Sequence, residues 1–188
     1  MKKLRFDSPL ILGYAILSGI ALLVNFLTGG WANVTLFSVY RCSFDLLAFV
    51  RLFGHIIGHV SLAHYAGNFM MILLLGPALE RRYGWKLLLL FIAATAVVTG
   101  LLQMALFPST MLLGASGIVF MMIVLTACDG LREGSIPITL LLVVVLYLGE
   151  QLVTGLTVKD TVSQLGHIIG GLCGLAFGIA FTRKKTSV

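Results

Sequence analysis

Residues 87–107 read LLLLFIAATAVVTGLLQMALF, a stretch without a single Lys, Arg, Asp or Glu. A helix needs about 20 predominantly apolar residues to cross the hydrocarbon core of a bilayer. A charged side chain within such a segment is costly, and this stretch avoids that cost along its whole length. The segment therefore predicts a transmembrane helix.

Comparable apolar stretches recur on both sides of this one, which indicates a polytopic all-α membrane protein. By length and absence of charge we expect six spans: Pro9–Leu27, Leu62–Leu79, Leu87–Phe107, Ser116–Cys128, Ile136–Leu152 and Val162–Phe181. The fourth span is short and follows an uncharged connection at 107–114. Irregular backbone is tolerated at membrane depth where protein buries it, so we expect Ser116 to lie below the outer surface.

Composition supports one membrane domain and excludes a soluble one. Of 188 residues, 59% are hydrophobic and 11% are charged, far from the usage of soluble domains. The net charge of +6 would favour nucleic acid in a soluble protein, but here the basic residues cluster at span ends, so we expect the lipid bilayer and not nucleic acid as a partner. Cys42, Cys128 and Cys173 lack metal-ligand spacing, so no metal or cofactor is expected.

The basic residues also predict the orientation, because cytoplasmic segments carry the excess of Lys and Arg. Six spans leave three of the 13 basic residues outside, namely Arg41, Arg51 and Lys159. The other ten lie inside: Lys2, Lys3, Arg5, Arg81, Arg82, Lys86, Arg132, Arg183, Lys184 and Lys185. Both termini are therefore expected in the cytoplasm. The membrane itself is expected to be a bacterial inner membrane, which the charges do not decide.

The outer segment 29–61 is rich in aromatic and apolar side chains. Such a composition suits short helices lying in the headgroup layer, which we expect here. The aromatic residues are Trp31, Phe37, Tyr40, Phe44, Phe49 and Phe53.

Ser116 lies in the run Gly114-Ala115-Ser116-Gly117 at the outer start of the fourth span. A helix N-terminus presents free N–H groups and positive dipole character, which suit an oxyanion. Glycines on both sides allow close approach of a substrate backbone. These features favour Ser116 as a nucleophile, and the alternative is a contact between helices through small residues.

His167 lies in the outer half of the last span, where Gly166, Gly170, Gly174 and Gly178 share one helix face. Small residues at this spacing let two helix backbones approach closely. An ionisable side chain inside a membrane favours function, so His167 is a candidate base for Ser116. Hydrogen bonding between helices without chemistry is the alternative.

His64 and Asn68 are four residues apart and share one face at the outer end of the second span. Both can donate hydrogen bonds to a developing oxyanion, or merely to a neighbouring helix. His55 and His59 have the same spacing, which would suit a metal if a third ligand converged. No such ligand is evident, and we expect His55 and His59 to pack the loop.

Taken in order, these motifs resemble those of the rhomboid family of intramembrane proteases. The resemblance rests on His64 and Asn68 in the second span, Gly114 to Gly117 opening the fourth, and His167 with Gly170 and Gly171 in the sixth. It covers about Phe49 to Phe181, within a single rhomboid-like domain over residues 1–188. Two departures stand out: Val50 precedes Arg51 where the family often has Trp, and Phe120 occupies the place of a frequent Tyr.

The resemblance implies a serine endopeptidase that cleaves transmembrane proteins with a Ser116–His167 dyad. The backbone N–H of Ser116, His64 and Asn68 would hold the oxyanion, while Gly114, Gly117, Phe120, Gly170 and Gly171 would support the site. Neither departure from the family pattern, at Val50 or at Phe120, removes a group that would transfer a proton or hold the oxyanion. The alternatives are a catalytically silent rhomboid-like binder of membrane proteins and a small transporter or metal-handling protein.

Overall fold

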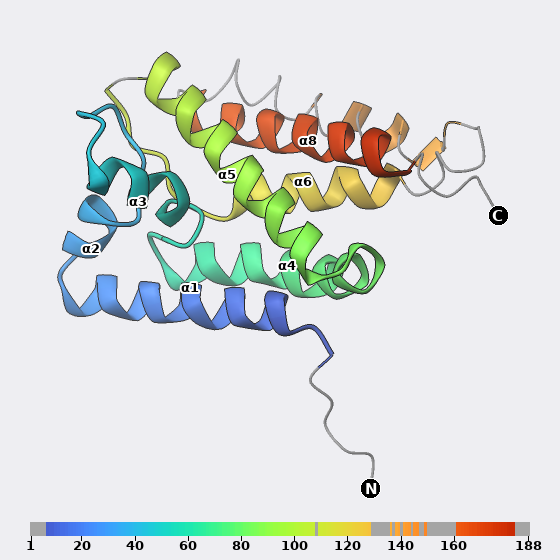
Figure 1. The fold of residues 1–188 in the computed structure, drawn as a ribbon. Helices are drawn as coiled ribbons and strands as arrows, with labels where there is room; N and C mark the ends of the chain where they lie inside the picture. The colour runs from blue at the N-terminus through green and yellow to red at the C-terminus, as the bar shows by residue number, and fades with distance from the viewer. Residues whose placement is uncertain are drawn as a thin grey trace, which may run out of the picture.

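A computed structural model describes residues 7–107, 109–128 and 161–182, together with positions 136, 138–139, 141–143, 145–146 and 149. Within this part of the chain the named elements are all helices (Figure 1). In chain order they are α1 (Pro9–Leu27), α2 (Trp31–Thr35), α3 (Leu46–Gly54), α4 (Leu62–Tyr83), α5 (Trp85–Leu106), α6 (Ser116–Ala127) and α8 (Thr161–Thr182).

Four of these helices are long and apolar enough to cross a membrane: α1, α4, α5 and the Gln164–Phe181 part of α8. The shorter apolar helix α6 lies beside α8 (Figure 1). The prediction of an all-α membrane bundle is thus confirmed. The fifth predicted span, Ile136–Leu152, falls largely outside the described residues.

Helix α4 is longer than the predicted span, which ended at Leu79. It continues to Tyr83 and stops at Gly84, where φ is +77°. The first residue of the extra turn, Glu80, has a partner in α1. The Glu80 carboxylate accepts the backbone N–H groups of Leu10 and Ile11, both at 3.1 Å. It therefore caps the N-terminus of α1, whose own N-cap residue makes no side-chain cap bond.

Helices α6 and α8 pack through glycine, as the recurrence of glycines in the last span predicts. A Cβ on Gly170 would collide with the carbonyl oxygen of Gly117, and one on Gly174 with that of Met121. The two backbones therefore touch along more than one turn. This contact brings the start of α6 and the outer half of α8 to the same level of the bundle.

The outer segment contains the predicted short helices α2 and α3, which lie at one end of the bundle (Figure 1). In α3, Arg51 is buried while Leu46 and Phe49 are exposed. The Nε of Arg51 donates to the carbonyl of Thr35 at 2.9 Å, and its guanidinium lies 4.5 Å from the centre of the Tyr40 ring. Arg51 thus anchors this segment although Val50 stands beside it in place of Trp.

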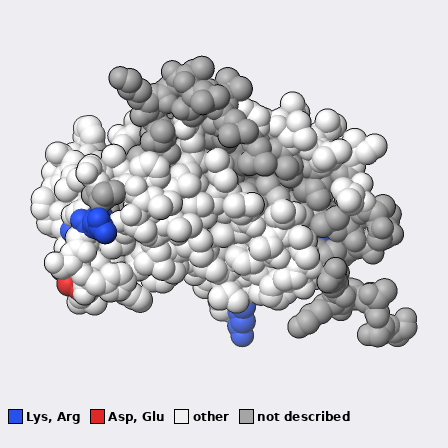
Figure 2. Space-filling model, turned by 90° about the horizontal axis from the view of Figure 1, so that it is seen from above, with Lys and Arg blue, Asp and Glu red and all other residues white. Residues whose placement is uncertain are grey.

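Figure 2 shows one face of the molecule, on which the charged side chains of the described residues lie toward the edges. Large apolar side chains are exposed on the long helices instead, among them Ile16, Leu74, Leu90 and Leu172. In water such a surface would be unstable, whereas lipid solvates it. The chain is therefore an integral membrane protein.

Candidate active site

The loop before α6 is exposed at residues 109–111, but its last residues, Gly114 and Ala115, are buried and held by backbone hydrogen bonds. Leu112 pairs with Val39 through two backbone hydrogen bonds of 2.9 Å, and the N–H of Gly114 donates to the carbonyl of His55 at 2.8 Å. Ala115, wholly buried, is the N-cap of α6. Ser116 follows as the first residue of that helix and is half-buried.

The two predicted oxyanion donors lie beside this loop. Gly114 has a φ of +124°, and a Cβ at this position would lie 2.8 Å from Cε1 and Nε2 of His64 and 3.8 Å from Nδ2 of Asn68. His64 is in the first turn of α4, where the Oγ of Ser61 accepts its backbone N–H at 3.1 Å. The structure therefore brings His64 and Asn68 to the turn that leads into Ser116.

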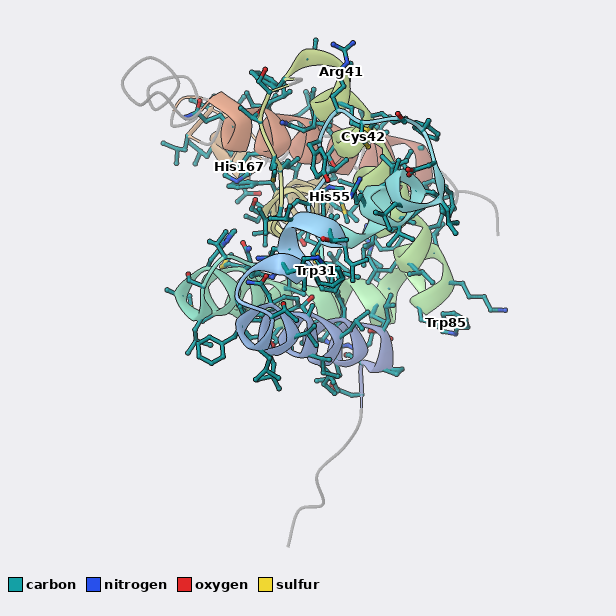
Figure 3. All side chains as sticks on the ribbon, turned by 90° about the vertical axis from the view of Figure 1, so that its left-hand side faces the viewer. Trp31, Arg41, Cys42, His55, Trp85 and His167 are labelled. Atoms are coloured by element: carbon teal, nitrogen blue, oxygen red, sulfur yellow. The ribbon has the colours of Figure 1, made fainter. Side chains whose placement is uncertain are left out.

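His167 meets α6 one turn beyond the serine. Its ring centre lies 4.5 Å from that of Phe120, with the rings tilted by 42°. A Cβ on Gly117 would lie 3.2 Å from the carbonyl oxygen of Gly166. Ser116 and His167 are the chain neighbours of these two glycines, on α6 and α8 respectively. Figure 3 shows His167 leaving α8 on the side turned toward the rest of the bundle.

Of the supporting glycines predicted in α8, Gly170 lies where the two helices meet. It stands directly against the Gly117 backbone, while Gly171 is buried. A side chain at Gly170 would push the helices apart, so this glycine contributes to how His167 lies relative to Ser116. The assigned catalytic roles stay predictions.

His55 occupies the packing position that was expected of it. Its Nδ1 lies 3.2 Å from the carbonyl of Arg51, and its Nε2 lies 3.2 Å from the Thr99 hydroxyl of α5. A carbonyl only accepts, so Nδ1 carries the proton in its bond to Arg51. Nε2 then shares the single hydroxyl proton of Thr99 with the carbonyl of Thr95, which lies 2.8 Å from the Thr99 oxygen. Burial lowers the pKa of His55, in keeping with this neutral ring.

His59 is the residue whose setting the sequence analysis missed. We expected it to pack the loop, but its Nε2 lies 3.0 Å from Nδ2 of Asn68 and 3.4 Å from the backbone nitrogen of Ala115. It therefore contacts one candidate oxyanion donor and the turn before Ser116. The spacing from His59 to Asn68 gave no signal, because a bend separates them, and the contact with Ala115 exists only once α6 packs against this bend.

The comparisons with known proteins agree with this arrangement in one respect. The family model of the Rhomboid domain matches residues 47–184. The matched region runs from α3 to the end of α8 and includes every candidate residue named above. Among curated proteins no match is found.

Proposed function

The chain belongs to the rhomboid family, and from this premise we propose that it is an intramembrane serine protease. It cleaves peptide bonds in or near transmembrane segments of other membrane proteins. The observation that carries the proposal is the meeting of three elements at one point. Helix α4 supplies His64 and Asn68, helix α6 begins there with Ser116, and helix α8 places His167 one turn beyond, against Phe120.

In the proposed mechanism, His167 takes the proton from Oγ of Ser116 as the oxygen attacks the substrate carbonyl. The resulting oxyanion accepts hydrogen bonds from the Ser116 backbone N–H, His64 and Asn68. His167 then gives its proton to the leaving amine, which departs and leaves an acyl-enzyme. Water repeats the sequence on the ester and releases the second product.

Packing supports a dyad in which no carboxylate is required to orient the histidine. The ring of Phe120 lies 4.5 Å from the His167 ring, and the glycine contact between α6 and α8 fixes the helix that carries it. Phe120 supplies the ring that the Tyr of many relatives would supply, without its hydroxyl. The proposed chemistry uses side chains and backbone of this chain alone, with no metal or cofactor.

The proposed substrate is a helix of another membrane protein that is unwound near its outer end. A regular helix keeps its carbonyls in its own hydrogen bonds, so only an unwound stretch offers a peptide bond to Ser116. The distribution of Lys and Arg supports an orientation with both termini in the cytoplasm. We propose that the protein resides in a bacterial inner membrane and does not bind nucleic acid.

The proposal is tested by replacing Ser116 with Ala in the full chain in liposomes that contain a single-span test substrate. We expect cleavage to fall to the background rate, because no other nucleophile is proposed. Ser18→Ala is the matched control. It removes a buried hydroxyl of α1 that has no hydrogen-bond partner in the described part of the chain, and it should leave cleavage intact.

Unchanged turnover in Ser116→Ala would refute the assignment. A fluorophosphonate probe separates a protease from a catalytically silent binder of membrane proteins. An activated Ser116 forms a covalent adduct with the probe, whereas a binder leaves it unreacted. The adduct is located by mass spectrometry of the intact protein and of its peptides.

A further inference from the structure

His59 lies in the bend 55–61 that joins α3 to α4, and it is wholly buried. Side chains from two other elements hold the backbone of this bend. The Tyr14 hydroxyl donates to the carbonyl of Ile56 at 2.7 Å, and Nδ2 of Asn33 donates to the carbonyl of His59 at 3.0 Å. The backbone that carries the His59 imidazole is therefore held in place.

The partners of His59 define its tautomer. The backbone N–H of Ala115 can only donate, so Nε2 of the ring must offer a lone pair to it at 3.4 Å. The proton then resides on Nδ1, which donates to the carbonyl of Ile57 at 3.0 Å. With Nε2 unprotonated, the group that Asn68 turns toward it at 3.0 Å has to be the amide NH₂. In the opposite tautomer, the N–H at Nε2 would face the N–H of Ala115, and the lone pair of Nδ1 would face the carbonyl oxygen of Ile57.

Through the single lone pair of Nε2, which the N–H groups of Asn68 and Ala115 share, His59 thus joins the two sides of the proposed oxyanion site. One bond orients the Asn68 amide so that its second N–H remains for the site. The other fixes the turn that leads into Ser116. We propose, on the basis of the proposed function, that His59 is a positioning residue that holds Asn68 and the Ala115–Ser116 turn in register with each other.

The electrostatic setting of His59 supports this role. Burial lowers the pKa of His59, and the nearby His64 lowers it further. The titratable groups that face the ring are His64, at 5.0 Å between ring centres, and Tyr65, at 5.6 Å. A protonated ring would direct an N–H at both Asn68 and Ala115, so only the neutral ring serves as their common acceptor.

Two substitutions separate positioning from bulk packing. In His59→Gln, the terminal oxygen is as many bonds from Cα as Nε2 and can still accept from Asn68. In His59→Asn, the amide matches the position of Nδ1 and can bond Ile57, but it does not reach Asn68. We expect His59→Asn to lower kcat by about 100-fold, the usual cost of misplacing a catalytic group by about 1 Å. KM should change little, and His59→Gln should recover most of the loss.

A double substitution tests whether the effect passes through the oxyanion donor. Groups that act as one unit give non-additive losses. In an Asn68→Ala background, His59→Asn should therefore cost much less than it does in the unsubstituted chain. His55→Asn is the matched control: it removes an equally buried imidazole that bonds Arg51 and Thr99 instead. It should lower the melting temperature and give no kcat loss that depends on Asn68.

Equal losses in His59→Asn and His59→Gln, or additive losses with Asn68→Ala, would overturn the proposal. Nitrogen NMR of the unsubstituted chain, labelled in its histidines, tests it independently of proteolysis. The His59 signal, assigned by its absence in His59→Gln, should show an unprotonated Nε2; a protonated Nε2 would contradict the proposal. If the unsubstituted chain cleaved nothing, the proposed function would fail, whereas the NMR signal would still decide the hydrogen bonding of His59.

Discussion

At the scale of single residues, Gly114 is required both by the backbone conformation and by a close contact with the side chain of His64. Its φ of +124° is rarely adopted by residues with a side chain, and the space where a Cβ would stand is taken by His64. A glycine here therefore does two things. It lets the chain turn into α6, and it lets a candidate oxyanion donor lie against that turn.

Replacing Gly114 with Ala should abolish most cleavage while the protein remains folded. The methyl group would push His64 away, and loss of one oxyanion donor typically costs about 100-fold or more in kcat. Gly84→Ala is the matched control, because Gly84 also has a positive φ, +77°, but its Cβ would meet nothing within 4 Å. Both variants should lose some stability to backbone strain, measured by thermal unfolding in detergent. If Gly84→Ala impaired cleavage as much, strain and not the His64 contact would explain the loss.

The four histidines show what residue types alone convey. His64 lies beside Gly114, and His167 lies against Phe120. His55 and His59 share the same spacing and similar burial, yet one bonds Thr99 and the other bonds Asn68. Sequence spacing could not separate these two, because each partner belongs to a helix that packs against the bend from a different side.

At the scale of elements, the contact between α6 and α8 positions the proposed dyad. The two helices carry Ser116 and His167, and glycine backbones touch at Gly117 and Gly170. Because the contact is formed by backbone atoms, it leaves no flexible side chain that can yield to an insertion. The distance between the two proposed catalytic groups therefore depends on the absence of a methyl group at this contact.

Gly170→Ala should consequently lower both stability and activity. Extra volume in a well-packed contact costs about 1–3 kcal/mol, and a displaced α8 would carry His167 away from Ser116. In Gly13→Ala of α1 the new Cβ would meet nothing within 4 Å, so stability should hold or rise slightly. Melting temperature and kcat, measured on both variants in the same detergent, test this difference. Equal behaviour of the two variants would show that α6 and α8 tolerate separation.

At the scale of the whole molecule, Glu80 ties α1 to the rest of the bundle. Helix α1 precedes residues 47–184, which the Rhomboid domain matches. The Glu80 carboxylate of α4 bonds the N–H groups of Leu10 and Ile11, and the Tyr65 hydroxyl bonds the carbonyl of Ala15 at 2.9 Å. The first helix is thus held to α4 at two levels.

Glu80→Ala should lower the free energy of unfolding by about 0.5–2 kcal/mol, the usual cost of losing a helix N-cap. Arg81→Ala provides the comparison, because Arg81 forms an exposed ion pair with Asp7 at 3.5 Å. Exposed pairs contribute about 0–1 kcal/mol. Unfolding in detergent should show the larger loss for Glu80→Ala. A larger loss for Arg81→Ala would mean that the surface pair, not the cap, holds α1.

The sequence by itself determined the class of molecule and the approximate bounds of α1, α4, α5, α6 and α8, and it supplied the candidates for the site. It did so because hydrophobic length and local motif spacing are properties of one segment at a time. Only the tertiary structure decided that Glu80 caps α1, that Arg51 anchors the outer segment through Thr35, and that His59 binds Asn68 and Ala115. Each of these is a hydrogen bond between segments distant in the chain or separated by a bend, and its geometry arises only when the helices pack.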